Sequence, residues 1–252
     1  MKRSHRVTGI LLASLICNAG ARCQKPGATP MPDSQRSAAN VAVRDVRILL
    51  VNGQPQCRIS ISGAFTIRTN TKAVLRGGKV SLTTVSINPQ RNIVFGDRVL
   101  GRGVFDVVPE AGATIDLARQ DGRKWTAPRR YPGFLRLSTD DHDRLRVVNF
   151  VDIETYVACV LPGEMPARFH REAQRAQTVA IRTYVLYEMA SRSHRAYDVR
   201  ATEASQVYMG LLADKDFAPA RATTDSTRGI VGTWGSPDGE RVVCMFYSSC
   251  CG

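Results

Sequence analysis

The chain has 252 residues, of which 43% are hydrophobic and 23% charged, and this balance excludes a multi-span membrane protein and a wholly disordered chain. Its length suits one large domain or two small ones. The 35 basic and 22 acidic residues give a formal net charge of +13, which favours an anionic partner: nucleic acid, anionic lipid or a carboxylate-bearing cell-wall polymer.

Residues 1–21 have the layout of a secretory signal peptide. Three basic residues precede a run from Val7 to Ile16 in which every non-apolar member is small, and Ala19-Gly20-Ala21 supplies the small residues that a signal peptidase reads. The run has ten residues, well short of the ~20 that a membrane span needs. We therefore expect an exported protein of the periplasm or cell envelope, with no transmembrane span in the mature chain.

Export narrows the choice of anionic partner. Nucleic acid is disfavoured outside the cytoplasm, and the sequence has no helix-turn-helix pattern and no aromatic RNA-binding signature. We expect no nucleic-acid partner, which leaves the polyanions of the cell envelope as the partners of this basic chain.

Residues 22–40 contain three prolines and almost no large apolar side chain, which predicts a disordered linker. A β-rich N-terminal part is expected over residues 41–130. Within residues 58–68, apolar and polar side chains alternate with the period of two that is typical of half-buried strands. The same reasoning predicts further strands at 79–87, 98–108, 114–118, 134–137 and 145–150.

Helical spacing begins after Asp152. Apolar residues from Ile153 to Val160 recur at helical intervals, and Leu161-Pro162-Gly163 is expected to interrupt that helix. A second helix is predicted from Pro166 or Arg171 to Ser191. Its expected buried stripe consists of small residues, namely Ala173, Ala176, Val179, Ala180 and Thr183.

Strand-like segments return near the end of the chain, at 207–210, 229–233 and 241–247. Strands that are followed by mixed helices and strands predict an α+β fold. Disulfides are permitted in an exported protein, but spacing does not fix their pairing, and a bridge from Cys244 or Cys250 to Cys159 or Cys57 stays open.

Seven short motifs follow one another from residue 131 onward. They are Tyr131-Pro132-Gly133, Leu145–Asn149, Ile153–Tyr156, Leu161–Pro166, Glu172–Tyr184, Ser205–Gly210 and Phe246–Cys250. In this order they resemble the sporulation stage II protein D / LytB (SpoIID/LytB) domain family of peptidoglycan-acting proteins. The resemblance implies a SpoIID/LytB-like domain over residues 131–252, shortened at its C-terminus because the family normally continues beyond the last motif.

The resemblance also implies an activity. Family members are lytic transglycosylases that cleave the MurNAc-GlcNAc glycan strands of peptidoglycan, preferably strands without stem peptides, and leave 1,6-anhydro ends. The glutamate of the family's G-E-M-P motif falls on Glu164, which becomes the expected catalytic acid. The arginine of its A-x-R-T-Y run falls on Arg182.

A single carboxyl group suffices for this chemistry. It protonates the leaving oxygen and then takes a proton from the C6 hydroxyl of the sugar, which attacks C1 and closes the anhydro ring. Leu161, Pro162, Met165 and Pro166 surround Glu164 with apolar side chains, which favours the neutral carboxyl that a general acid needs. The alternative is that Glu164 caps a helix that Pro166 begins.

Three further residues are predicted to bind substrate. Arg182 has the forked donors that suit a sugar or a lactyl carboxylate, while Gln206 and Tyr208 suit hydrogen bonding to sugar rings and stacking on them. The alternatives are a structural ion pair for Arg182 and a core strand for the other two.

No cofactor and no metal are expected. Some family members hold zinc around the S-Q-x-Y motif, but the matching positions here are Arg200, Ala204 and Ser205, which are poor zinc ligands. The predicted partner is the peptidoglycan glycan strand. One alternative is a non-catalytic wall-binding module that stimulates a cell-wall amidase. Another is an envelope scaffold that binds through charge alone, and high salt would abolish that binding.

Overall fold

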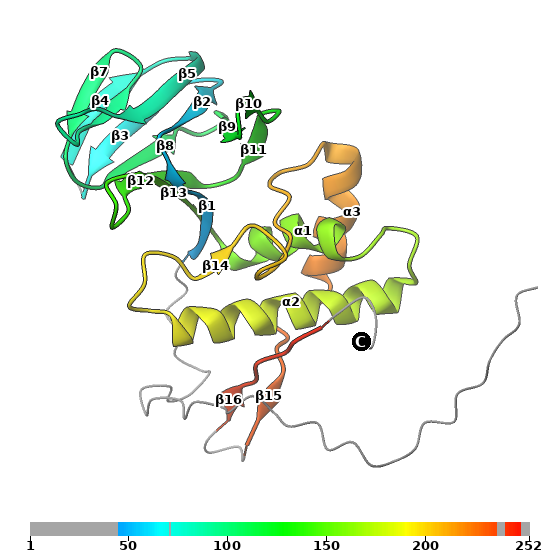
Figure 1. Cartoon of the computed structure of the whole chain (residues 1–252). Coiled ribbons are helices and arrows are strands. Elements are labelled where there is room, and N and C mark those ends of the chain that lie inside the picture. Colours follow the sequence, from blue (N-terminus) through cyan, green and yellow to red (C-terminus); the bar gives the residue numbers. More distant parts are fainter. Residues whose placement is uncertain (1–44, 71, 236–239, 248–252) are drawn as a thin grey trace, which may run out of the picture. The chain divides into compact units, whose positions relative to one another are not determined.

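The structure is a computed structural model that describes residues 45–70, 72–235 and 240–247, and Figure 1 shows its elements. The predicted signal peptide, 1–21, and the predicted linker, 22–40, lie outside the described residues. Within the described ranges, strands dominate up to residue 151 and three helices follow. The expected α+β fold with a β-rich N-terminal part is confirmed.

Two sheets and the helices share one hydrophobic core. The first sheet has the order β14-β1-β13-β12-β8-β3-β4, and the second has the order β10-β9-β2-β5-β6-β7 with β11 also paired to β9. The first contains β1 Val46–Gln54, β3 Phe65–Thr69, β4 Lys72–Gly77, β8 Phe105–Pro109, β12 Phe134–Thr139, β13 Leu145–Val151 and β14 Val199–Arg200. The second contains β2 Gln56–Ile61, β5 Val80–Ile87, β6 Ile93–Phe95, β7 Arg98–Gly101, β9 Ile115–Asp121, β10 Lys124–Trp125 and β11 Arg129–Tyr131.

The alternating pattern of the sequence explains the buried faces. In β2, residues Cys57, Ile59 and Ile61 are buried and alternate with half-buried polar neighbours. The predicted strand over 98–108 is two strands, β7 and β8, because Gly101, the last residue of β7, and Gly103, just after it, adopt positive φ angles of 107° and 127°.

Strand β1 joins the two halves of the chain. It pairs antiparallel with β13 on one side and parallel with β14 on the other, so the first sheet runs across the predicted boundary at residues 130 and 131. The Arg47 side chain of β1 binds Asp198, with Nη2 2.6 Å from Oδ1, and donates to the carbonyl oxygens of Arg192 and Arg195. These contacts hold the chain just after the second helix against β1.

Helix α1 spans Ile153–Glu164, and the Asp152 side chain caps it by accepting from the N–H of Thr155 at 3.0 Å. The predicted interruption at Leu161-Pro162-Gly163 is wrong, since the helix continues to Glu164. Pro162 lies in the last turn and removes only one helical hydrogen bond, while the segment from Tyr156 to Leu161 is buried in the core.

Helix α2 spans Arg171–Ser191, so of the two predicted starts Arg171 is confirmed. Ala180 and Thr183 of the predicted stripe are buried, but Ala176 is exposed. The larger side chains of the second half of α2 carry most of the contact with the core. Helix α3, Asp214–Asp225, was not predicted, because its Ala- and Thr-rich sequence has little apolar periodicity.

The last predicted strands are shorter than expected or absent. Among the residues described there, only β15, Thr233–Trp234, and β16, Arg241–Val242, form, as a two-stranded ribbon beside α2 in Figure 1. Residues 207–210 do not form a strand. The Tyr208 side chain is held by Asn149 and Tyr156 instead.

Three absences concern the described residues alone. None of their helices is long and apolar enough to cross a membrane. Cys57, Cys159 and Cys244 are free thiols, and Cys250 lies outside the described part. No group of ligating side chains suited to a metal ion occurs among the described residues.

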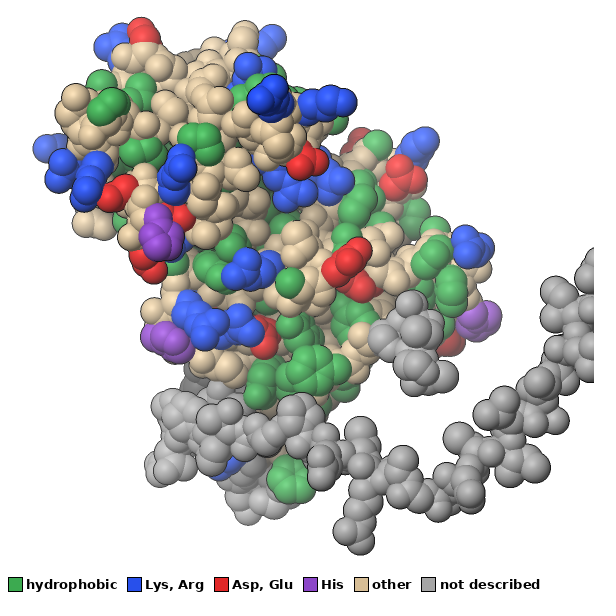
Figure 2. Space-filling view, viewed as in Figure 1, with side chains coloured by type: hydrophobic (Ala, Val, Ile, Leu, Met, Phe, Trp, Pro, Cys, Tyr) green, Lys and Arg blue, Asp and Glu red, His purple; other side chains and the backbone are tan. Residues whose placement is uncertain are grey.

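Figure 2 shows Lys and Arg side chains spread over the visible face and not gathered into one patch.

Candidate functional site

Glu164 is the last residue of α1, and its side chain is half-buried. The backbone N–H of Val207 donates to its Oε1 at 2.6 Å, and among the described residues this carboxyl forms no ion pair. Pro162 and Met165 line a hollow of about 260 Å³, whose lining does not include Glu164 itself. The structure therefore leaves a carboxyl that is held at one oxygen and partly open to solvent.

The alternative role for Glu164, as the cap of a helix that Pro166 begins, is wrong. Glu164 ends α1, and α2 begins only at Arg171 with His170 as its cap. The connecting residues from Pro166 to His170 are exposed.

Gly163 lets the chain around Val207 approach this end of α1. A Cβ on Gly163 would lie 2.6 Å from the Val207 carbonyl oxygen and 3.1 Å from Cγ of Met209. No side chain fits at that distance without moving the backbone. The close approach is what brings the Val207 N–H within reach of Glu164.

We expect Gly163→Ala to lower the free energy of unfolding by about 1–3 kcal/mol, the usual cost of overpacking, because the new methyl group must push Val207 away. Urea denaturation of the full chain measures the change. Gly78→Ala is the matched control, since a Cβ at Gly78 has no atom within 4 Å. Equal stability of the two variants would contradict the close packing at Gly163.

Gln206 is only 1% exposed and joins two tyrosines. Tyr156 donates its hydroxyl proton to Gln206 Oε1 at 2.8 Å, and Gln206 Nε2 donates to the hydroxyl oxygen of Tyr247 at 2.8 Å. Burial, and then the negative charge of Glu164, raise the pKa of Tyr247 well above its ordinary value. Tyr247 is half-buried, so the hydrogen bonds from Tyr156 through Gln206 end at a partly exposed side chain.

Tyr208 lies in the core, 1% exposed. Its hydroxyl donates to Asn149 Oδ1 at 2.7 Å, and its ring stacks on Tyr156 with the centroids 5.5 Å apart. Asn149 Nδ2 donates in turn to the carbonyl oxygens of Pro132 and Phe134. Four of the motifs noted in the sequence therefore meet at one buried cluster, which favours the core role for Tyr208.

Arg182 is 1% exposed and fully engaged inside the protein. Its Nε and Nη2 donate to the two carboxylate oxygens of Glu154 at 3.0 and 2.7 Å. The remaining N–H groups face the carbonyl oxygens of Ile230, Thr224 and Thr178 at 3.1–3.5 Å. A guanidinium has five N–H donors, so none is left for a sugar, and the geometry favours the structural role.

Sequence reasoning missed Glu154 and Tyr247 as parts of this region. Glu154 lies 28 residues before Arg182, and no spacing rule links them. Tyr247 lies within the motif Phe246–Cys250, but no functional role was predicted for it. The neighbouring Phe246 is 80% exposed, which is unusual for so large an apolar side chain.

Two comparisons bear on this region. Residues 141–234 match the family model described as "SpoIID: Stage II sporulation protein", and the resemblance found in the sequence is confirmed over that segment. An uncharacterized protein of Brachyspira hyodysenteriae is 34% identical over 112 residues, which make up 44% of this chain and 29% of that protein. The segment matched by the family model, residues 141–234, contains α1, α2 and α3, and with them Glu164.

Proposed function

Residues 141–234 match the SpoIID family model, and from this premise we propose that the chain is an exported peptidoglycan-acting protein of the periplasm or cell envelope. The SpoIID domain supports a role connected with the cell wall or with sporulation. Within that role, the proposed activity is that of a lytic transglycosylase that cleaves MurNAc-GlcNAc glycan strands.

The observation that carries the proposal is the contrast between the two glutamates of α1. Glu154, at the start of the helix, is buried and paired with Arg182. Glu164, at its end, is half-buried and is held only through the N–H of Val207 within the described residues. An acid–base group must be positioned and must also be accessible to a substrate, and of the two glutamates Glu164 is the one that is both held in place and partly exposed.

The proposed reaction needs no second carboxylate. The protonated carboxyl of Glu164 gives its proton to the glycosidic oxygen as the C1–O bond of the muramic residue breaks. The C6 hydroxyl oxygen of the same residue then bonds to C1, and its proton passes to the Glu164 carboxylate. The products are a 1,6-anhydro end and a new free hydroxyl, and the enzyme is returned to its starting state.

The products of glycan digestion test the proposal. The full chain is incubated with glycan strands freed of stem peptides, and the soluble fragments are weighed by mass spectrometry. Lytic transglycosylation leaves fragments one water lighter than hydrolysis does. Hydrolysed ends, or the absence of fragments, would reject the proposed activity.

A second candidate function is a non-catalytic wall-binding module that stimulates a cell-wall amidase. The burial of Arg182, Gln206 and Tyr208 favours it, because these three residues, predicted to bind substrate, lie 1% exposed in the core. This candidate requires that the protein speed peptide release by an added amidase and that Glu164→Gln do so equally well.

A further inference from the structure

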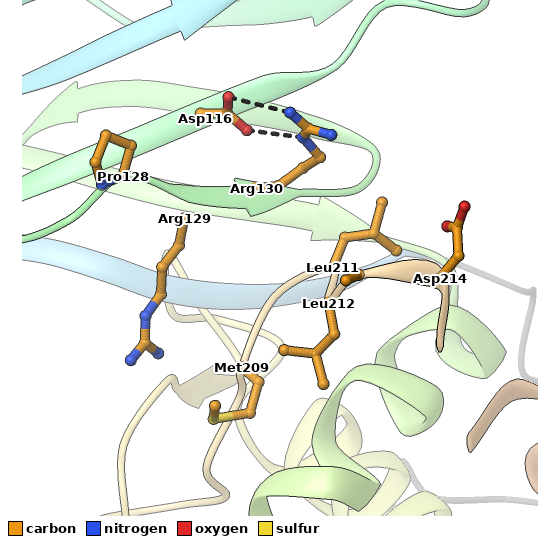
Figure 3. A pocket seen from close by; sticks show the side chains of 9 residues that line it. Asp116, Pro128, Arg129, Arg130, Met209, Leu211, Leu212 and Asp214 are labelled. Carbon is orange, nitrogen blue, oxygen red and sulfur yellow. Dashed lines mark hydrogen bonds and ion pairs between the residues drawn. The ribbon is translucent and has the colours of Figure 1, made fainter. Parts of the chain in front are cut away.

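A hollow of about 660 Å³ lies between β11 and the chain that leads from Met209 into α3. This volume falls in the range of small-ligand sites, roughly 300–1,000 Å³. Met209, Leu211 and Leu212 give it an apolar lining, and Arg129 and Arg130 come from β11 (Figure 3). We call it the Arg129 hollow.

The two arginines of the hollow differ in their partners. Arg130 binds Asp116, with Nε 2.9 Å from Oδ1, and this pair raises the pKa of Arg130. Arg129 is exposed, and its guanidinium forms no hydrogen bond or ion pair with any residue the structure describes. Figure 3 shows its side chain directed away from the Asp116–Arg130 pair, toward the end of the hollow where Met209 lies. That end therefore presents an unneutralised cation beside an apolar surface.

The opposite end of the hollow has the opposite charge. Asp214, the first residue of α3, lies there beyond Leu212 (Figure 3). An anionic group is therefore attracted only to the Arg129 end, while the Asp214 end accepts hydrogen bonds from hydroxyl or amide N–H groups. A ligand that suits both ends carries one carboxylate, some apolar surface and several neutral donors.

Met209 connects the Arg129 hollow to the last turn of α1, the helix that ends at Glu164. Met209 lines the hollow, and its Cγ lies 3.1 Å from the position of a Cβ on Gly163, the residue before Glu164. The Met209 side chain therefore borders both the hollow and the end of the helix that carries Glu164.

We infer that the Arg129 hollow binds a muramic residue of the glycan through its free lactyl carboxylate, with Arg129 as the partner of that carboxylate. The lactyl and acetyl methyl groups suit the lining of Met209, Leu211 and Leu212. A stem peptide converts the carboxylate into an amide and removes the charge that Arg129 recognises. The hollow is then a subsite that selects peptide-free strands, and this inference rests on the proposed glycan substrate.

Calorimetric titration tests the inference with two probes that differ in one group. One is a GlcNAc-MurNAc disaccharide with a free lactyl acid, and the other is the same disaccharide as its primary lactyl amide. The full chain carries Glu164→Gln so that no cleavage occurs during the titration. We expect the acid to bind about fivefold more tightly than the amide, the upper range for an exposed ion pair.

Arg129→Gln should abolish that fivefold preference. Arg98→Gln is the matched control, because Arg98 is equally an exposed strand arginine, 71% exposed in β7, and does not line the hollow. The inference is overturned if the preference survives in Arg129→Gln, or if neither probe binds. Loss of anhydro products with an intact, Arg129-dependent preference would instead reject the proposed cleavage and leave the subsite standing.

Discussion

Glu164→Gln is expected to reduce the formation of 1,6-anhydro ends by a factor of about 10² to 10⁴, the range lost with a general acid–base group. The amide cannot give a proton to the glycosidic oxygen or take one from the C6 hydroxyl. Its carbonyl oxygen still accepts from the N–H of Val207, as Oε1 of Glu164 does at 2.6 Å. Folding and glycan binding should therefore be unchanged, and mass analysis of timed digests measures the loss.

Glu172→Gln is the matched control for that experiment. Glu172 is a 65% exposed glutamate in the first turn of α2, and its replacement removes the same charge from a neighbouring element. Release of anhydro ends by Glu164→Gln at the rate of Glu172→Gln would remove Glu164 from the reaction.

Arg182→Met is expected to lower the free energy of unfolding by about 3–5 kcal/mol, since breaking a buried pair leaves an uncompensated charge. The Glu154 carboxylate, with a side chain 7% exposed, would lose both guanidinium bonds. The carbonyl oxygens of Ile230 and Thr224 would lose a donor as well. Urea denaturation of the full chain, followed by circular dichroism, measures the change.

The double variant Glu154→Leu/Arg182→Met separates the ion pair from simple packing. Replacing both charged groups by apolar ones of similar size is often close to neutral, so we expect it to recover most of the lost stability. A loss below about 1 kcal/mol in Arg182→Met alone, the scale of an exposed pair, would contradict the structural role of Arg182 and return it to substrate binding.

The fold was predictable where its signal is local. Alternation along residues 58–68 predicts β2 and β3, and apolar spacing predicts α1 and α2, because each pattern reports one buried face of one element. The end of α1 was not predictable in the same way. Pro162 suggests a break, but burial of the preceding turns outweighs one lost hydrogen bond.

The candidate site was predictable only in part. The motif around Glu164 identifies a carboxyl, and the structure leaves that carboxyl half-buried and positioned by Val207. Residues 207–210 read as a strand, yet they form none, and side chains from distant segments hold Gln206 and Tyr208 in place. Arg182 and Arg129 are the same residue type in the sequence. Only their tertiary contacts show that every N–H donor of the Arg182 guanidinium is engaged, while the Arg129 guanidinium has no hydrogen bond or ion pair among the described residues.

The pairing of strand β1 limits where this protein can be truncated. A shorter form that begins with the SpoIID segment would have a gap between β13 and β14, and β13 would expose a row of unpaired backbone groups there. It would also lose the guanidinium that anchors Asp198. We therefore expect truncation or domain exchange to preserve folding only when β1 is kept together with the family match.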